Sequence, residues 1–408
     1  MPMKPFRSSS GRLPAVSLTT LLLLLPASPG EATGQVPGQA GEAAFEVRVD
    51  TIAVGLEHPW GLALLPDGRF LVTERNPGTL RLGGAEGELS GPLDGVPEIF
   101  RYEGETGRSQ AGLFDVRLHP EFEQNRWVYL SLSAPTPRGA ALTVIRGRLV
   151  EEAGGEPRLE DVEEIFVMKE DDQDSSGLHF GGSLAFEPGG THLFLSIGDR
   201  RNLERAQDLE DQAGAILRMT EDGEPAPGNP FAGSDEEDPY LWSWGHRNPQ
   251  GMTTDAATGQ LWIVDHGPQR GDGVYRVERG ANYGWPLYTE GKDYSGAPLG
   301  YEERPSEVAE AAHVFDETVA PSGLVIYRGA AFPEWDGHLL TGGLVTRAVH
   351  LLRITGEAEV TEAGRLATEL DRRIRNVRVA EDGSIWVITE HEDGEVLRLR
   401  PRDTTLPN

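Results

Sequence analysis

The sequence predicts an all-β protein, a six-bladed β-propeller of four-stranded antiparallel blades around a central channel. The first observation is a phrase that recurs six times: an apolar strand, a Pro/Asp/Gly turn, and a strand of aromatic and β-branched residues. The second is its spacing of about 50 to 70 residues, which fits four-stranded blades with inserted loops. The third is weak helical periodicity, since only Leu203 to Met219 favours a turn or two of helix.

Each copy of the phrase reads as a β-hairpin with its turn chemistry in place. In chain order the copies cover residues 61–74, 112–131, 182–197, 251–264, 323–340 and 377–388. The fifth copy is looser than the others. A two-domain β-sandwich is the alternative fold, but a sandwich does not explain why the same hairpin returns six times.

The N-terminal segment is predicted to be a targeting sequence. Lys4, Arg7 and Arg12 precede an apolar run at 13–25, and small residues follow it. The run is shorter than the roughly 20 residues of a membrane span, although a retained anchor is the alternative. We therefore expect a periplasmic or secreted protein without a membrane span in the mature chain. The expected organisation is a signal peptide (1–31), a disordered spacer (32–45), the propeller catalytic domain (46–402) and a tail (403–408).

Composition excludes several classes of function. The chain of 408 residues has no cysteine, so thiol chemistry and Cys-ligated metals are impossible, and core and sheets alone hold the fold. Its formal charge of −29 argues against nucleic acid or anionic membrane surfaces as partners.

The first candidate site pairs His179 with Asp199. His179 lies in a glycine-flanked loop just before a strand, where a neutral imidazole could take a proton from a hydroxyl. A lone histidine is more often a capping or core residue. Asp199 ends the second strand of the same hairpin, so it is expected to lie close to His179, orient it and stabilise its charged form.

A second candidate is the dense donor array of Arg247, Asn248 and Gln250, which Pro249 immobilises between flanking glycines. Such an array suits a polyanionic or carbonyl-rich ligand. A hydrogen-bonded blade junction is the alternative for Asn248 and Gln250, but it explains the whole string poorly.

Two further patterns carry polar groups. Backbone carbonyls at the Gly267-Pro268 turn can be oxygen ligands for a hard cation such as Ca²⁺, although Gly-Pro is chiefly a turn signal. Arg373 and Arg375 are two residues apart, which puts both guanidinium groups on one strand face. Two like charges there favour an anionic partner, with solvated surface arginines as the alternative.

Together these strings resemble the soluble pyrroloquinoline quinone (PQQ)-dependent glucose and aldose sugar dehydrogenases, over roughly residues 56–399. The order and spacing of the motifs follow the family's. The short forms, the aldose sugar dehydrogenases, match better than the longer glucose dehydrogenases because the loops are compact and the His-Phe-Gly-Gly string is present. The most specific strings are Gly245-His-Arg-Asn-Pro-Gln-Gly251, His266-Gly-Pro268, Ala281-Asn-Tyr-Gly-Trp-Pro286 and Thr318-Val-Ala-Pro321.

The resemblance implies that an aldose is oxidised at C1 to the lactone, with hydride passing to the quinone C5 and electrons to an external acceptor (cytochrome, quinone or dye). It makes His179 the general base, Asp199 its orienting partner, and Arg247 the stabiliser of negative charge at the C5 carbonyl. Carbonyl oxygens of Gly267 and Pro268, with cofactor atoms, would bind a catalytic Ca²⁺ that acts as a Lewis acid. The residues implied to hold PQQ are Gln110, Arg247, Asn248, Thr318, Arg347, Arg373 and Arg375.

The chain departs from the family's pattern at two places. Many members have Gly-Gly-Asp-Glu after the Gly-Pro turn, and its Glu helps to bind a second, structural calcium. Here the string is Gly271-Asp272-Gly273, which leaves Asp272 and Tyr283 as candidate ligands of a second Ca²⁺. The arginine usual after His-Phe-Gly-Gly is Ser183, which changes the polarity near His179.

Two other functions fit a propeller. A Ca²⁺-dependent lactonase or other hydrolase needs carboxylate and amide side chains that converge on the metal, whereas the candidates here are arginines and backbone carbonyls. A non-catalytic binding propeller would be expected to have lost His179 or Arg247, and both are present.

Overall fold

The computed structural model describes residues 43–102 and 109–402. The predicted signal peptide, most of the predicted spacer and the tail therefore lie outside the described residues. No helix in the described ranges is long and apolar enough to cross a membrane. The helical elements are short: α1 (Phe122–Asn125) and the 3₁₀ helices η1 (Glu170–Asp172), η2 (Leu203–Gln207), η3 (Pro333–Trp335) and η4 (Thr368–Leu370).

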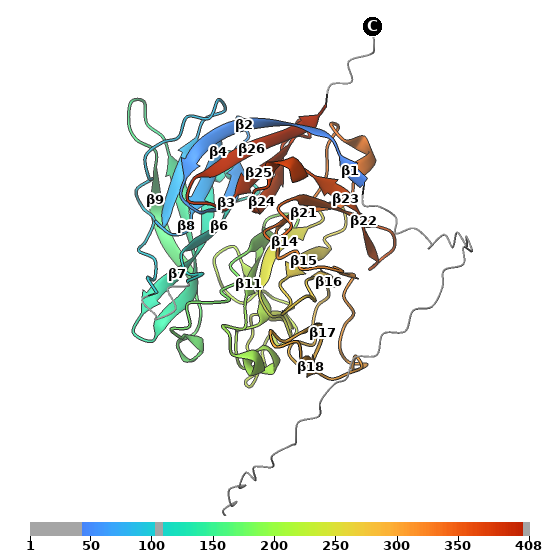
Figure 1. The fold of residues 1–408 in the computed structure, drawn as a ribbon. Helices are drawn as coiled ribbons and strands as arrows, with labels where there is room; N and C mark the ends of the chain where they lie inside the picture. The colour runs from blue at the N-terminus through green and yellow to red at the C-terminus, as the bar shows by residue number, and fades with distance from the viewer. Residues whose placement is uncertain (1–42, 103–108, 403–408) are drawn as a thin grey trace, which may run out of the picture. The chain divides into compact units, whose positions relative to one another are not determined.

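Antiparallel sheets form the blades of the propeller, and Figure 1 shows them in chain order around the axis. Blade 1 holds β3 (Pro59–Leu64), β4 (Phe70–Glu74) and β5 (Thr79–Gly83). Blade 2 holds β6 (Leu113–Leu118), β7 (Trp127–Thr136), β8 (Gly139–Val150) and β9 (Arg158–Val167). Blade 3 holds β10 (Leu184–Phe186), β11 (His192–Ile197), β12 (Ala215–Thr220) and β13 (Leu241–Trp244).

The second half of the chain continues the pattern. Blade 4 holds β14 (Pro249–Thr254), β15 (Leu261–Asp265), β16 (Gly273–Val277) and β19 (His313–Val314), with the hairpin β17 (Tyr288–Lys292) and β18 (Pro298–Gly300) inserted. Blade 5 holds β20 (Pro321–Ile326), β21 (Leu339–Gly343), β22 (Val349–Ile354) and β23 (Val360–Leu366). Blade 6 holds β24 (Ile374–Val379), β25 (Ile385–Thr389), β26 (Gly394–Pro401) and β2 (Val47–Leu56).

The innermost strands form a closed ring, which confirms the predicted propeller. Contacts run from β3 to β6, β10, β14, β20 and β24, and from β24 back to β3. Each of the six hairpins predicted from the repeat is the first hairpin of one blade. Hydrophobic side chains fill the space within and between neighbouring blades, so the core is a set of clusters arranged around the channel.

The second strand, β2, closes the ring by completing the last blade. β2 pairs antiparallel with β26, from Val47 opposite Pro401 to Leu56 opposite Gly394. In Figure 1 the blue β2 accordingly lies beside the red β26. A strand from near the start of the described chain and its last strand thus share one sheet, a closure that the hairpin pattern alone did not reveal.

Two details differ from the sequence prediction. Blade 1 has three strands rather than four. A strand lies before residue 46, where the propeller was expected to begin: β1 (Ala43–Phe45) adds a parallel fifth strand to blade 5, and the Phe45 ring lies 5.3 Å from that of Trp335. The stretch from Leu203 to Met219 does contain a short helix, η2, as predicted, and its last residues belong to β12, which pairs with both β11 and β13.

Glycines of the repeated phrase allow successive inner strands to approach closely. A Cβ atom on Gly61 would lie 2.7 Å from the carbonyl oxygen of Phe114 on β6. A Cβ on Gly251 would lie 2.1 Å from the carbonyl oxygen of Ser322 on β20. Because these neighbours are backbone atoms of the next blade, a larger residue would push the blades apart.

Gly251→Ala tests this packing, with Gly91→Ala as the matched control because a Cβ on Gly91 meets nothing within 4 Å. We expect Gly251→Ala to lower the free energy of unfolding by about 2–3 kcal/mol, as overpacked sites do, and Gly91→Ala to change it little. Urea denaturation of both variants measures the difference. Equal stabilities would contradict close packing at the ring.

Candidate active site

His179 and Asp199 form a buried hydrogen-bonded pair at one end of blade 3. His179 precedes β10 and Asp199 follows β11, so the hairpin brings them together. Nδ1 of His179 donates to Oδ1 of Asp199 over 2.6 Å, and the two residues are 6% and 0% exposed. A carboxylate only accepts, so Nδ1 carries the proton and neutral His179 keeps its lone pair on Nε2. Nε2 has no hydrogen-bond partner among the described residues.

Electrostatics keep this imidazole neutral and this carboxylate charged. Burial lowers the pKa of His179, and the positive charges of Arg247 and Arg201 lower it further, against the raising effect of Asp199. Burial alone would raise the pKa of Asp199, but the pKa falls because the hydrogen bonds from His179 and the backbone N–H of Arg201 and the charge of Arg247 favour the carboxylate. A neutral imidazole held by an ionised carboxylate is the arrangement of a general base.

The backbone of His179 is also fixed. It has a φ of +48°, in the left-handed region that non-glycine residues seldom adopt. Its N–H donates to Oε1 of Gln110 over 2.7 Å, which ties the histidine to blade 2. Strained backbone that the surroundings hold in place is common at functional sites.

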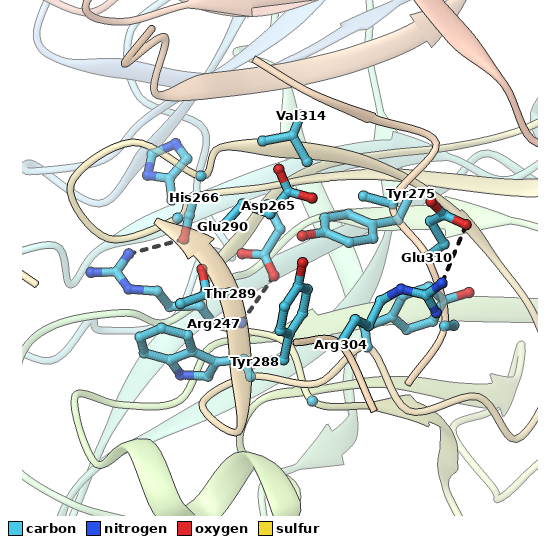
Figure 2. A pocket seen from close by; sticks show the side chains of 17 residues that line it. Arg247, Asp265, His266, Tyr275, Tyr288, Thr289, Glu290, Arg304, Glu310 and Val314 are labelled. Carbon is cyan, nitrogen blue, oxygen red and sulfur yellow. Dashed lines mark hydrogen bonds and ion pairs between the residues drawn. The ribbon is translucent and has the colours of Figure 1, made fainter. Parts of the chain in front are cut away.

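Arg247 is a buried cation at the start of blade 4. Its backbone N–H donates to Oδ2 of Asp265 over 2.9 Å, and Nη1 donates to the carbonyl oxygen of His266 over 3.0 Å. Figure 2 shows both interactions in the pocket that Arg247 lines. Nη2 lies 3.3 Å from the hydroxyl of Tyr294, on the β17–β18 hairpin. The guanidinium forms no ion pair with any described residue, so its charge is available to a ligand.

A second cavity, of about 310 Å³, adjoins the His179 loop. We name it the arginine cavity, after Arg75, Arg373 and Arg375, which surround Glu390. Glu390 contacts their guanidinium nitrogens over 3.0, 2.8 and 2.8 Å respectively. Burial alone would raise the pKa of Glu390, but the three arginines hold it well below its ordinary value. Three cations against one carboxylate leave this cavity positively charged.

The interior of the arginine cavity combines unsatisfied donors with aromatic rings. Arg375 is 4% exposed; Nη1 donates to Oε1 of Gln250 over 3.0 Å, and Nε has no acceptor among the described residues. A buried N–H without an acceptor costs free energy, so this donor favours a bound acceptor. The other residues lining the cavity include Trp60, Phe114, Phe180, Gln110, Asn248 and Gln250.

Two residues assigned to cofactor binding lie outside the arginine cavity. Thr318 is exposed. Arg347 is also exposed, and its Nη1 pairs with Oδ1 of Asp371 over 2.7 Å. Each lies in a loop, Thr318 before β20 and Arg347 between β21 and β22, and both side chains are exposed to solvent while nearby Ala320 and Leu344 line the cavity. The structure therefore does not bring Thr318 or Arg347 to the ligand space.

Two residues of the cavity were missed from the sequence, Arg75 and Glu390. A signal was present in the repeat itself. Arg75 comes directly after β4 and Glu390 directly after β25, and Asp199 and His266 come just after the second strands of their blades. A polar residue just after the second strand of a blade is therefore a sequence signal for a residue at this end of the channel.

The turn of the proposed metal site is held by Asp272. Its Oδ1 accepts the N–H of Gly267 over 3.0 Å, and its Oδ2 accepts those of Val319 and Ala320 over 2.9 and 2.8 Å. No described residue donates to the carbonyl oxygens of Gly267 or Pro268, which leaves both free for a cation.

The side chains predicted as second calcium ligands are used by the protein itself. The Asp272 carboxylate binds three backbone N–H groups, and the Tyr283 hydroxyl donates to the carbonyl oxygen of Arg276 and accepts the N–H of Glu278. No group of three or more His, Asp or Glu side chains within 43–102 and 109–402 is placed to hold a metal ion. The structure thus gives Asp272 and Tyr283 structural roles.

Two other histidines lie near the cavities, and neither matches His179 as a base. His266 has Nε2 2.7 Å from the carbonyl oxygen of Pro321, which fixes Nε2 as the donor, and burial lowers its pKa to about 3. His246 is fully buried beneath Tyr283, and burial lowers its pKa to about 3 as well.

Known proteins resemble the chain over all its blades. Residues 56–398 match the family model described as Glucose / Sorbosone dehydrogenase. The aldose sugar dehydrogenase YliI of Escherichia coli is 36% identical over 364 residues, covering 88% of this chain and 95% of that protein. The structure of the soluble aldose sugar dehydrogenase of E. coli in its apo form gives a TM-score of 0.81 at 35% identity, covering 88% of this chain and 100% of that chain. The PQQ-bound aldose sugar dehydrogenase of Streptomyces coelicolor gives 0.67 at 25% identity, covering 87% and 98%.

Asp272→Ala separates a structural role from a calcium-binding one. Loss of the acceptor leaves three N–H groups unpaired, so we expect the free energy of unfolding to fall by about 3 kcal/mol. The loss should be the same with Ca²⁺ and with EDTA in urea denaturation, because the carboxylate binds backbone and not metal. If the loss in free energy of unfolding disappeared in EDTA, Asp272 would instead be a calcium ligand.

Proposed function

The chain belongs to the glucose/sorbosone dehydrogenase family, and we propose that it is a PQQ-dependent aldose sugar dehydrogenase that oxidises its substrate at C1 to the lactone. One observation carries the proposal: the positively charged arginine cavity lies beside the neutral His179 and its carboxylate partner. Gln110 lines this cavity and binds the backbone of His179, and Phe180 and Gly181, which follow the histidine, line it too.

The arginine cavity fits an anionic, planar quinone. Guanidinium groups of Arg75, Arg373 and Arg375 suit carboxylates, which they bind through paired N–H groups. The unpartnered Nε of Arg375 adds a donor that needs an acceptor. Side chains of Trp60 and Phe180 add apolar surface to the lining of the cavity. These residues, with Gln110 and Asn248, are the ones we expect to hold PQQ.

A hard cation fits the turn beside it. The carbonyl oxygens of Gly267 and Pro268, free of donors from the described residues, are ligands of the kind that Ca²⁺ prefers. When bound, PQQ supplies the acceptor for the hydride, and Ca²⁺ polarises the quinone carbonyl.

The protein's own part in the reaction is to move one proton and to balance charge. Nε2 of His179 takes the proton of the anomeric hydroxyl, which makes C1 a better hydride donor. Asp199 stabilises the imidazolium that results and holds the ring in place. The unpaired guanidinium of Arg247 stabilises negative charge that develops nearby, and burial strengthens this effect.

The calcium-dependent hydrolase is less well supported. A metal-bound water needs several side-chain ligands around the ion, and no suitable carboxylate and histidine cluster exists within 43–102 and 109–402.

We further propose that residues 1–31 direct export to the periplasm or the medium, and that a separate acceptor protein, quinone or dye removes the electrons.

Reconstitution tests the cofactor and its site together. Protein made without PQQ should be folded and inactive, and should gain sugar:dye oxidoreductase activity with PQQ and Ca²⁺. Arg375→Ala should weaken the PQQ affinity about tenfold to a hundredfold, since a charge-assisted hydrogen bond is worth roughly 1.5–3 kcal/mol. Titration of the apoprotein with PQQ, followed by absorbance, measures the affinity.

Arg347→Ala is the matched control, because this arginine is exposed and paired with Asp371 outside the cavity. We expect it to bind PQQ like the parent protein. Activity with NAD, no activity after reconstitution, or equal affinities of the Arg375 and Arg347 variants would contradict the proposal.

His179→Ala separates the chemistry from binding. The variant should retain PQQ but reduce it with sugar about 10²–10⁴-fold more slowly, the usual contribution of a positioned base. Single-turnover rates measure this step, with His192→Ala as control because His192 lies on β11 and pairs with Glu187. If the His179→Ala variant reduced PQQ as fast as the parent protein, another residue would be the base.

The pH dependence follows from the protonation of His179. The base works when neutral and its pKa lies below 6.5, so the rate should rise with pH below that value and level off above it. Asp199→Asn removes the group that raises this pKa, so the rising limb should move to lower pH while the rate falls. A limb that moves to higher pH would contradict the assignment.

A further inference from the structure

We propose that Trp285 is a positioning residue that tunes the basicity of His179 through Asp199, an inference that rests on the proposed role of His179. The indole N–H of Trp285 donates to Oδ2 of Asp199 over 2.8 Å. Trp285 is 6% exposed, and Asp199 is fully buried. This bond lies on the oxygen that His179 does not use.

The backbone of Trp285 is held by two separate segments. The backbone N–H of Trp285 donates to the carbonyl oxygen of Gly245 over 2.9 Å. Its carbonyl oxygen accepts from Nε2 of Gln207, on η2, over 2.7 Å. Gln207 is itself held by Asn282, whose Nδ2 donates to its Oε1 over 2.7 Å. With its backbone fixed by two segments, the ring presents its N–H in one direction.

The same ring also contacts Arg247. The guanidinium carbon lies 5.5 Å from the ring centroid, within the range of a cation–π interaction. The N–H of Trp285 thus contacts the Asp199 carboxylate, and the face of the same ring contacts the guanidinium of Arg247.

The other donors and charged groups around the His179–Asp199 pair can be named. Oδ1 of Asp199 accepts from His179 and from the backbone N–H of Arg201, and among the described residues Trp285 is the donor to Oδ2. The other charged or titratable groups whose fields act on the pair are Arg200, Arg201, Arg247, Asp265 and His266.

Loss of the indole N–H would therefore concentrate the negative charge of Asp199. A hydrogen bond to a carboxylate favours its charged form, so without this bond Asp199 attracts protons more strongly. The proton on His179 is then held more tightly, and its pKa rises. Because the base must be neutral, the rising limb of the rate would move to higher pH, opposite to the effect of Asp199→Asn.

Trp285→Phe removes the N–H and keeps an aromatic ring against Arg247. ¹⁵N NMR titration of the cofactor-free protein follows the His179 imidazole, identified by the signal that His179→Ala lacks. We expect the His179 pKa to rise by roughly 0.5–1 units in Trp285→Phe. In the Asp199→Asn background the substitution should have no effect, because the connecting carboxylate is gone.

Trp242→Phe is the matched control, since the indole nitrogen of Trp242 is buried without a partner among the described residues. It should leave the His179 pKa unchanged. If Trp285→Phe does not fold, benzothienylalanine incorporated at position 285 removes the N–H at nearly constant volume.

An unchanged or lowered His179 pKa, or the same shift with and without Asp199, would overturn the proposal. The titration needs neither cofactor nor activity. A failed reconstitution would thus refute the dehydrogenase function without affecting the Trp285 measurement, and a flat titration would refute only the role of Trp285.

Discussion

The close packing of the six innermost strands around the channel is the constraint on which the site depends. Glycine permits backbone contact between blades at Gly61 and Gly251. Arg378 of β24 then joins three blades, donating to the carbonyl oxygen of Leu62 over 2.9 Å and to Oδ1 of Asp115 over 3.1 Å. Such contacts fix the distances between the ends of the innermost strands. Side chains that are far apart in the sequence are therefore brought together by the rigid blades rather than by flexible loops.

That rigidity allows the site to hold charge in advance of any ligand. Burial of a guanidinium is costly, and the protein offsets the cost for Arg375 with Glu390 and for Arg247 with a backbone carbonyl. Neither arrangement neutralises the local positive charge. Fixed donors in a buried site need no reorganisation when an anion binds or when negative charge develops, whereas water would have to reorient.

The sequence predicted features that local backbone geometry determines. Turn residues located all six hairpins, one hairpin joined His179 to Asp199, and period-two spacing put Arg373 and Arg375 together. It did not predict contacts that depend on the placement of whole blades, such as Arg75 with Glu390, Trp285 with Asp199, or β2 with β26. Likewise, the distance of Thr318 and Arg347 from the cavity depends on loop conformations that motif order does not specify.

Protonation and placement together distinguish His179 from its neighbours. Burial alone would make any of the three histidines near the cavities a poor proton acceptor, because the imidazolium that forms has lost its hydration. Asp199 offsets part of that penalty for His179 by supplying a negative charge 2.6 Å away. His266 instead has a neutral carbonyl, and the nearest carboxylate oxygen to His246 is 3.8 Å away. A buried base is thus helped by a buried carboxylate, and the pKa of that carboxylate is itself held down by donors and charges such as His179, the backbone N–H of Arg201 and Arg247.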